Sequence, residues 1–280
     1  VPSEVTLPMS QHIGAPAKPV VNVGDKVFVG TLVAEAGGFV SAPVHSSVSG
    51  TIKSISENDN GTFITVTSDG EMTPDSNLKP FEIKEAKDIA AAAEACGLVG
   101  LGGAGFPTYV KFSADEEKLC NLIINGAECE PYITSDSYVM ETRFEDIYYA
   151  IEKILEFFPF ERVTIAVELN KPQAIRKMQE IAERNPKISV KPLKTIYPQG
   201  AEKVLVYNTT GKVIGEGMLP IDAGVIVVNC TTLATIASYV KTGMPLVEKC
   251  VTVDGGAVKN PQNVTVSIGT PISQVFAFCG

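Results

Sequence analysis

The first 84 residues alternate between apolar and polar positions in short runs that turn residues interrupt. Val21, Val23, Val27 and Val29 lie two positions apart on either side of a Gly-Asp pair. A period of two places successive side chains on opposite faces of a β-strand, and Gly-Asp favours a tight turn. The pattern predicts half-buried strands joined by tight turns, and an all-β domain over residues 1–84.

From residue 85 onward the pattern changes to helices and buried strands in alternation. Strands are predicted over residues 119–125, 161–170 and 188–195, and helices over residues 83–96, 143–159 and 171–186. The strands are short apolar runs, whereas the helices have apolar residues near helical spacing or are rich in alanine. Alternation of this kind builds α/β layers, so we expect an α/β domain over residues 85–245.

Composition narrows the function classes. The chain has 280 residues, 45% of them hydrophobic, and a formal net charge of −9. It can bury a sizeable core, but the acidic balance without a basic run argues against broad contact with nucleic acid. The longest apolar runs fall far short of the roughly 20 residues that span a bilayer. Because the N-terminal segment has no basic region followed by an apolar one, we expect a cytoplasmic setting and no direct membrane insertion.

Cysteine and histidine usage argues against a metal site within this chain. The six cysteines are spread widely and form no C-x-x-C motif, and there are two histidines. Iron-sulfur and structural zinc sites are usually built from local cysteine or histidine motifs. We therefore expect scattered reduced thiols and no metal ligands.

The stretch GLVGLGGAGFPTYVK, residues 97–111, carries an unusual density of glycine. Gly100, Gly102 and Gly105 fit the G-x-G-x-x-G spacing of dinucleotide-binding loops. However, the preceding segment predicts a helix, whereas that motif should follow a strand. A Walker A loop is excluded because Phe106 and Pro107 stand where Lys and Ser or Thr are required. A glycine-rich connection that binds nothing stays an alternative at this point.

The all-β segment resembles the biotinyl/lipoyl barrel-sandwich family. The resemblance lies in VGDKVFVGTLVAEA followed by VSAPVHSSVSGTI. In those carriers a lysine at the hairpin tip between the halves takes the prosthetic group, but the tip here, residues 36–44, has no lysine. The resemblance implies the fold and argues against a swinging arm. We expect His12 and His45 to be packed or interdomain residues and not catalytic bases.

Four further segments occur in the order found in the RnfC family. They are GLVGLGGAGFPTYVKF, LIINGAECEPYITSD, YPQGAEKVL and VVNCTTLATI. RnfC is the subunit of the Rnf electron-transport complex that takes electrons from NADH, and the same segments look like a diverged form of the NADH- and FMN-binding flavoprotein subunit of complex I. The resemblance covers essentially all of the chain and implies FMN and NADH as cofactors. The proline-reductase-associated electron-transfer protein PrdC shares these segments and is left open.

The resemblance implies a role for each matching residue. The glycine loop, residues 100–105, would lie under the flavin and nicotinamide, because a side chain there would block two stacked rings. Phe106 matches the aromatic position against the nicotinamide, and Lys111 matches the lysine beside the flavin. The full set of matched cofactor-binding positions is Gly100, Gly102, Gly103, Gly105, Phe106, Lys111, Asn125, Glu128, Glu130, Gly200, Glu202, Asn229 and Thr232.

Roles also follow for the later members of this set. Asn125 and Glu128 match positions that hydrogen-bond the flavin, and Glu130 matches an acid on the nicotinamide side. Asn229 and Thr232 match the late Asn and Thr that close the flavin site. The residues also allow plainer interpretations, in which Glu202 is a surface charge and Asn229 caps a helix.

Departures from the complex I pattern affect both sides of the site. Ala127 replaces an aspartate and Val228 replaces one of two adjacent asparagines at the flavin, whereas Leu101 replaces an arginine and so removes a fixed cation from the nucleotide side. Each lost hydrogen bond to flavin would be worth about 0.5–1.5 kcal/mol. We therefore expect weakened flavin affinity.

The last segment, residues 246–280, predicts a strand, a turn, a second strand and the start of a helix. It resembles the opening of the soluble-ligand-binding β-grasp (SLBB) module that follows the flavin domain in both families, and it stops early. Full-length RnfC continues into two four-iron clusters whose C-x-x-C-x-x-C-x-x-x-C-P runs are absent here. We expect 4Fe-4S clusters only in a C-terminal part that this chain lacks.

The expected function is electron input. NADH would be oxidised at FMN, and single electrons would pass through iron-sulfur clusters to other subunits of a Rnf-type membrane complex. Those partner subunits would hold the protein at the inner face of the cell membrane. The alternatives are a PrdC-type electron-transfer protein for a soluble reductase and a non-catalytic docking module with a vestigial nucleotide site.

Overall fold

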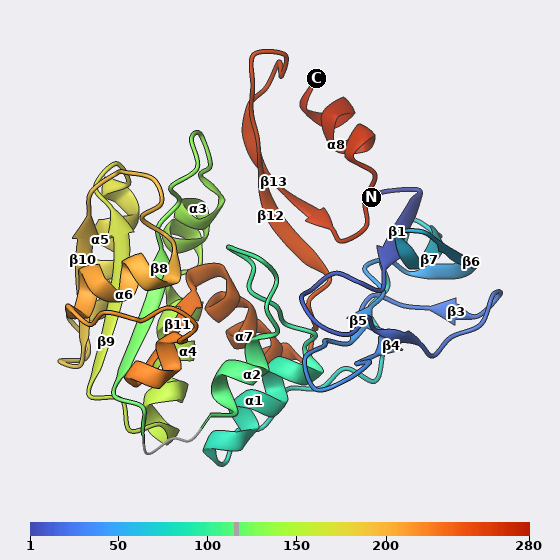
Figure 1. The fold of residues 1–280 in the computed structure, drawn as a ribbon. Helices are drawn as coiled ribbons and strands as arrows, with labels where there is room; N and C mark the ends of the chain where they lie inside the picture. Colours follow the sequence, from blue (N-terminus) through green and yellow to red (C-terminus); the bar gives the residue numbers. More distant parts are fainter. Residues whose placement is uncertain (115–117) are drawn as a thin grey trace.

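The computed structural model describes residues 1–114 and 118–280 (Figure 1). An all-β module comes first, an α/β unit follows, and a two-stranded hairpin with a short helix ends the chain. The order matches the expectation from the sequence in all three parts. The terminal hairpin lies between the other two parts in Figure 1.

Two sheets face each other in the all-β module, as expected for a barrel-sandwich fold. Its strands are β1 (Glu4–Pro8), β2 (Lys18–Pro19), β3 (Lys26–Val27), β4 (Leu32–Glu35), β5 (Val44–His45), β6 (Gly50–Asn58) and β7 (Gly61–Ser68). One sheet has the order β1-β7-β6-β3 and the other β2-β4-β5. Between them lies a core of Val5, Leu7, Val33, Ile64 and Val66, all fully buried.

The strand prediction around the first valines is wrong in part. Val27 and Val29 are buried as predicted, but Val23 is 62% exposed. The backbone amide of Asn22 donates to the Asp25 carboxylate at 2.7 Å. This local bond closes a turn at residues 22–25, so the pairing in this region is limited to the short strands β2 and β3.

The α/β unit is built on a parallel sheet with the order β10-β9-β8-β11. Its strands are β8 (Asn121–Gly126), β9 (Arg162–Glu168), β10 (Ile188–Leu193) and β11 (Val225–Asn229). All residues of β9 after Arg162 are buried, which is typical of a parallel strand covered on both faces. Carboxyl ends of parallel strands meet at one edge, so the ends of β8 and β11 bring Asn125 and Asn229 into register.

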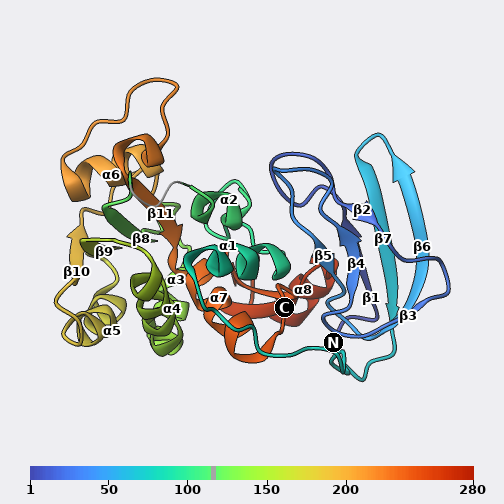
Figure 2. The same ribbon diagram turned by 90° about the horizontal axis from the view of Figure 1, so that it is seen from below.

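Helices cover the two faces of this sheet unequally. The helices of the unit are α1 (Ala86–Ala95), α2 (Thr108–Phe112), α3 (Ser135–Thr142), α4 (Phe144–Phe157), α5 (Pro172–Ala182), α6 (Glu202–Thr210), the 3₁₀ helix η2 (Pro220–Ala223) and α7 (Cys230–Thr242). Figure 2 shows α4 and α5 on one face and α6 on the other.

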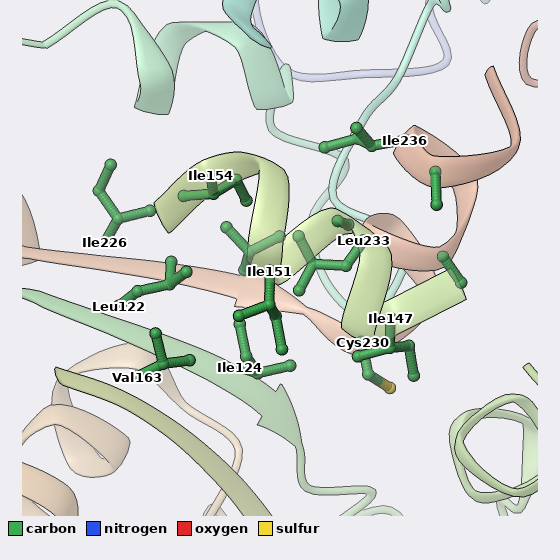
Figure 3. Close-up of a cluster of buried hydrophobic side chains, with 14 of the residues drawn as sticks. Leu122, Ile124, Ile147, Ile151, Ile154, Val163, Ile226, Cys230, Leu233 and Ile236 are labelled. Atoms are coloured by element: carbon green, nitrogen blue, oxygen red, sulfur yellow. The ribbon is translucent and has the colours of Figure 1, made fainter. Parts of the chain in front are cut away.

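The larger core explains why α4 forms where the pattern predicts it. Ile147, Ala150, Ile151 and Ile154 recur every three or four residues and are buried against β8, β9 and α7 (Figure 3). The helix ends at Phe157, because Pro159 disfavours a helical backbone at the residue before it, Phe158, which is extended.

The C-terminal part forms a hairpin of β12 (Glu248–Val253) and β13 (Gln262–Ser267), followed by α8 (Ile272–Cys279). Strand, turn, strand and helix follow in the predicted order. The hairpin contacts both other parts: Ser47 Oγ donates to the Ile268 carbonyl at 2.6 Å, and the Thr134 amide donates to Thr252 Oγ1 at 3.0 Å. These bonds tie the three parts together.

His45 lies at this junction, as expected for an interdomain residue. Its side chain is buried beside Gly97 of the α/β unit, and burial lowers its pKa to about 4. A small cavity of about 20 Å³ lies beside it, lined by residues of all three parts. His45 Nδ1 and Gln11 Nε2 are buried without a hydrogen-bond partner among the residues described. His12 is also engaged, because its Nε2 accepts from the Ala42 amide at 3.1 Å.

The hairpin tip that carries the lysine in lipoyl and biotinyl carriers has another contact here. Phe39 at the tip meets Tyr109 of α2 edge to face, with ring centroids 6.2 Å apart. The tip therefore touches the α/β unit through an aromatic pair.

The lysine-free tip predicts a chain without a prosthetic arm. Lipoyl and biotinyl groups are attached through a lysine amine, and residues 36–44 offer none. Intact mass spectrometry of the purified chain should give the mass of the polypeptide alone. An added mass equal to a lipoyl or biotinyl group would contradict this interpretation.

Candidate functional site

A cavity of about 500 Å³ opens at the carboxyl edge of the parallel sheet, on the α6 face. Its volume is in the range of small-molecule sites, and its place is the edge at which open α/β sheets bind ligands. Its walls come from the glycine loop, α2, the start of α6, η2, the end of β8 and most of β11. The lining residues are Gly100, Gly102, Gly103, Ala104, Phe106, Val110, Lys111, Asn125, Gly200, Ala201, Glu202, Leu219, Pro220, Ile221, Val225, Ile226, Val227 and Asn229.

The glycine loop is a closed turn held at its base. Val99 and Pro107 form an antiparallel bridge, and the Gly100 amide donates to the Phe106 carbonyl at 2.9 Å. Two side chains fix the turn from below: Thr232 Oγ1 accepts from the Leu101 amide at 3.1 Å, and Lys249 Nζ donates to the Leu101 carbonyl at 2.8 Å. The loop therefore presents its backbone to the cavity in a fixed pose.

Three glycines of this loop have different reasons to be glycine. A Cβ at Gly103 would meet nothing within 4 Å, so a side chain there would occupy open space. A Cβ at Gly102 would lie 2.3 Å from Asn229 Nδ2, which is a steric clash. Gly105 has a φ of +70° and approaches the Gln11 carbonyl of the all-β module. Gly105 is therefore needed for its left-handed backbone and its close contact with the all-β module, and it does not line the cavity.

Lys111 brings a positive charge to the cavity. Its Nζ donates to Glu202 Oε1 at 2.6 Å and to the Val227 carbonyl at 2.8 Å. The Lys111 side chain is 23% exposed and that of Glu202 44% exposed. Glu202 is thus half exposed, as the plainer interpretation expected, but it is also the counter-ion of the cavity lysine.

Both asparagines predicted at the site line the cavity, and both amides are engaged with protein atoms. Asn125 Nδ2 donates to the Gly200 carbonyl at 2.9 Å, and its Oδ1 accepts from the Ala127 amide at 3.1 Å. Asn229 is the N-cap of α7, accepting from the Thr232 amide at 3.1 Å. The helix-cap interpretation of Asn229 is therefore confirmed.

Besides Gly105, three predicted residues lie outside the cavity lining. Glu128 is buried and accepts from the amides of Asp136 and Ser137 at 2.7 and 2.9 Å, so its carboxylate caps the first turn of α3. Glu130 is exposed, and Thr232 holds the glycine loop from below. The flavin and nicotinamide roles assigned to these residues stay predictions.

Buried carboxylates concentrate beside the site. Burial raises the pKa of Asp136, and the nearby negative charge of Glu128 adds to the shift. Burial also raises the pKa of Glu168 at the end of β9, where Lys171 acts in the opposite direction. Lys171 Nζ lies 3.3 Å from Glu128 Oε2. Both oxygens of Glu168 lack a hydrogen-bond partner among the residues described.

The departures from the complex I pattern fall in different places. Val228 is buried in the larger core with Ile124 and Leu122 and does not line the cavity. The loss of a flavin hydrogen bond expected at this position stays a prediction. Leu101 packs partly against the same core. Ala127 packs against the smaller core on the α6 face.

The apolar wall of the cavity was not found from the sequence. It is formed by Leu219, which precedes η2, by Pro220 and Ile221 of η2, and by Val225 and Val227 of β11. No strand was predicted over β11, and nothing in the η2 sequence indicated a ligand wall. Asp136 was missed as well, because an acidic residue in the first turn of a helix is ordinarily exposed.

The described ranges hold neither a metal-binding cluster nor a membrane span. Within residues 1–114 and 118–280, no three His, Cys, Asp or Glu side chains are grouped so as to hold a metal ion. In the same ranges, no helix is both long and apolar enough to cross a membrane.

Three known domain families match consecutive parts of the chain. The RnfC barrel sandwich hybrid domain matches residues 1–69, the Nuo51 FMN-binding domain matches residues 93–238, and the SLBB domain matches residues 250–280. The FMN-binding match spans the glycine loop, the sheet edge and α7. It therefore contains most of the cavity wall.

Several curated proteins resemble the chain over its whole length. It is 41% identical to a subunit of the Na⁺-translocating ferredoxin:NAD⁺ oxidoreductase complex of Acetobacterium woodii, over 100% of this chain and 65% of that protein. It is 39% identical to a subunit of the proton-translocating ferredoxin:NAD⁺ oxidoreductase complex of Clostridium ljungdahlii, over 100% of this chain and 63% of the relative. The chain thus spans just under two thirds of the length of these relatives.

Solved structures resemble the fold. A crystal structure of NAD⁺-reducing [NiFe]-hydrogenase in the H₂-reduced state superposes with a TM-score of 0.57 at 20% identity, covering 72% of this chain and 41% of that one. At this identity the likeness concerns the fold alone.

Proposed function

We propose, since this chain belongs to the RnfC family, that its cavity binds FMN and that hydride passes there between a nicotinamide nucleotide and the flavin. The observation that carries the proposal is the glycine loop with open space at Gly103, on the wall of a 500 Å³ cavity. A planar ring system needs such bare backbone to lie against. The FMN-binding domain match over residues 93–238 supports the same ligand.

The residues present fit a flavin. Val225, Val227 and the η2 residues give one apolar wall, which suits the hydrophobic part of a ring system and excludes water. Lys111 gives a cation that would stabilise negative charge on the ring or on a phosphate. FMN, when bound, supplies a group that takes two electrons as hydride and releases them singly.

Individual roles follow from where the side chains lie. Gly103 leaves the ring space free, and Phe106 stands at the cavity wall where a nicotinamide would pack. Lys111 would exchange its contact with Glu202 for one with the ligand, because the half-exposed pair contributes little by itself. Asn125 orients the Gly200 backbone, and Asn229 fixes the loop.

Electron transfer beyond the flavin belongs to the whole protein. We propose that 4Fe-4S clusters lie in a part outside this chain, and that other subunits of a Rnf-type complex hold the protein at the inner face of the membrane. The first two relatives are named as ferredoxin:NAD⁺ oxidoreductase subunits. We also propose that the three domains of this chain are divided near residues 84 and 245.

Lys111→Ala tests the residue assignment. It should weaken FMN binding about ten- to hundred-fold, because a charged hydrogen bond is worth about 1.5–3 kcal/mol. The free energy of unfolding should change by no more than about 1 kcal/mol, since the Lys111–Glu202 pair is partly exposed. Titration calorimetry and urea unfolding give the two quantities.

Lys203→Ala is the matched control. Lys203 is exposed, its Nζ donates to the Gly215 carbonyl at 2.8 Å, and it does not line the cavity. It should bind FMN like the wild type. Equal binding by the Lys111→Ala chain would remove Lys111 from the flavin site, and absence of binding by the wild type would favour a docking module with a vestigial site.

A further inference from the structure

A buried carboxylate lies behind the cavity and does not line it. Asp136, in the first turn of α3, accepts from Asn229 Nδ2 at 2.6 Å and from Thr231 Oγ1 at 2.5 Å. Glu128 caps the same turn and holds the Asp136 amide at 2.7 Å. Two buried carboxylates this close are costly, so a defined task for them is expected.

Asp136 holds the side-chain amide of Asn229. Asn229 Oδ1 accepts from the Thr232 amide, and Asn229 Nδ2 donates to Asp136 and, at 3.5 Å, to the Asn125 carbonyl. Both amide hydrogens and one face of the oxygen are therefore engaged by protein atoms. In this arrangement Asn229 has no N–H left for a ligand.

The fixed amide supports the glycine loop. A Cβ at residue 102 would lie 2.3 Å from Asn229 Nδ2, so the backbone of Gly102 packs closely against this amide. The first turn of α7 adds a second contact, because Thr232 Oγ1 accepts from the Leu101 amide. Through these two residues, the N-terminus of α7 determines where the loop lies.

We propose that Asp136 is a positioning residue that fixes the Asn229 amide and, through it, the pose of residues 100–104 of the glycine loop at the cavity. Gly102 is then a glycine because of Asn229, whereas Gly103 is the position that faces a ligand. The expected effect of Asp136 on FMN affinity rests on the proposed function, whereas its expected effect on the pose of the loop does not.

Amide hydrogen exchange of the wild-type chain and four variants tests this role. In Asp136→Ala and in Asn229→Ala, the amides of residues 101–103 should exchange at least about tenfold faster than in the wild type. Asp136→Asn keeps the shape and an acceptor for Asn229, so it should stay within about threefold of the wild type. The buried strand amides of Ile123 and Ile165 report global opening. Their exchange rates should change only as far as the free energy of unfolding of each variant changes.

Thr231→Val is the matched control, because it removes the other partner of the Asp136 carboxylate and leaves Asn229 in place. Its loop amides should exchange like those of the wild type. Loop acceleration equal to that of Asp136→Ala would show a general packing role and overturn the proposal, as would unchanged exchange in Asp136→Ala. If Asp136→Ala does not fold, the loop exchange rates of Asn229→Ala and Asp136→Asn are compared instead. Faster exchange in Asn229→Ala alone supports the proposal, and equal rates in the two variants overturn it.

FMN titration of the same chains separates this proposal from the proposed function. Affinity should fall in the two alanine variants and be retained in Asp136→Asn. A wild type that binds no FMN would refute the proposed function, but the exchange rates of residues 101–103 would still decide the role of Asp136.

Discussion

Gly103→Val should abolish FMN binding, with at least about a hundred-fold loss of affinity, while the chain stays folded. A Cβ at this position meets no atom within 4 Å, and Gly103 is not among the glycines with positive φ. The backbone can therefore accept valine without strain, and the two methyl groups would fill ring space at the cavity wall. FMN titration and thermal unfolding measure the two effects.

The choice of glycine and of control decides what this variant shows. Gly102→Val is unsuitable because its Cβ would clash with Asn229 and disturb the loop itself. Gly256→Val is a suitable control, since its Cβ also meets nothing within 4 Å and the residue does not line the cavity. If Gly103→Val binds FMN like Gly256→Val, the flavin does not lie against the loop.

Stability should fall as the pH decreases from about 6.5 to 4, and His45 should account for much of the loss. The pKa of His45 is lowered by burial to about 4 in the folded chain, against 6.5 for the ordinary side chain. The unfolded state therefore takes up the proton first, and stability is fully present above the unfolded pKa and lost below it. The full shift corresponds to about 3 kcal/mol.

His45→Gln removes this titration and serves as its test. Between pH 7 and pH 5, the wild type should lose about 2 kcal/mol more unfolding free energy than the variant. Urea unfolding at the two pH values gives the difference, and the carboxylates shared by both chains cancel from it. Equal losses in the two chains would show that His45 is not held neutral at the junction of the three parts.

Much of the fold was predictable because local pattern and tertiary packing agree. The apolar spacing of α4 and the continuous apolar run of β9 each match the burial that the sheet imposes. The pattern failed at Val23, where side-chain bonding between Asn22 and Asp25 turns the chain out of a strand. Alternation of apolar and polar residues does not show where a local side-chain hydrogen bond replaces the pairing of strands.

The site was predictable as a set of segments but not as a set of contacts. The glycine loop, Lys111 and the two asparagines do meet at one cavity. Sequence matching gave no means to see that Glu128 faces a helix terminus, because this depends on how the seven residues between Glu128 and Asp136 fold back. Asp136 itself was missed for the same reason, since only the fold shows that it is buried.

An FMN titration of the wild-type chain, followed by quenching of flavin fluorescence, tests the central claim most directly. A flavin held against the Gly103 backbone and the β11 valines should be quenched in a saturable manner at one flavin per chain. The same titration with the Gly103→Val chain should show no saturation. Absence of saturable quenching by the wild type up to about 100 µM FMN would contradict the assignment of this cavity to a flavin.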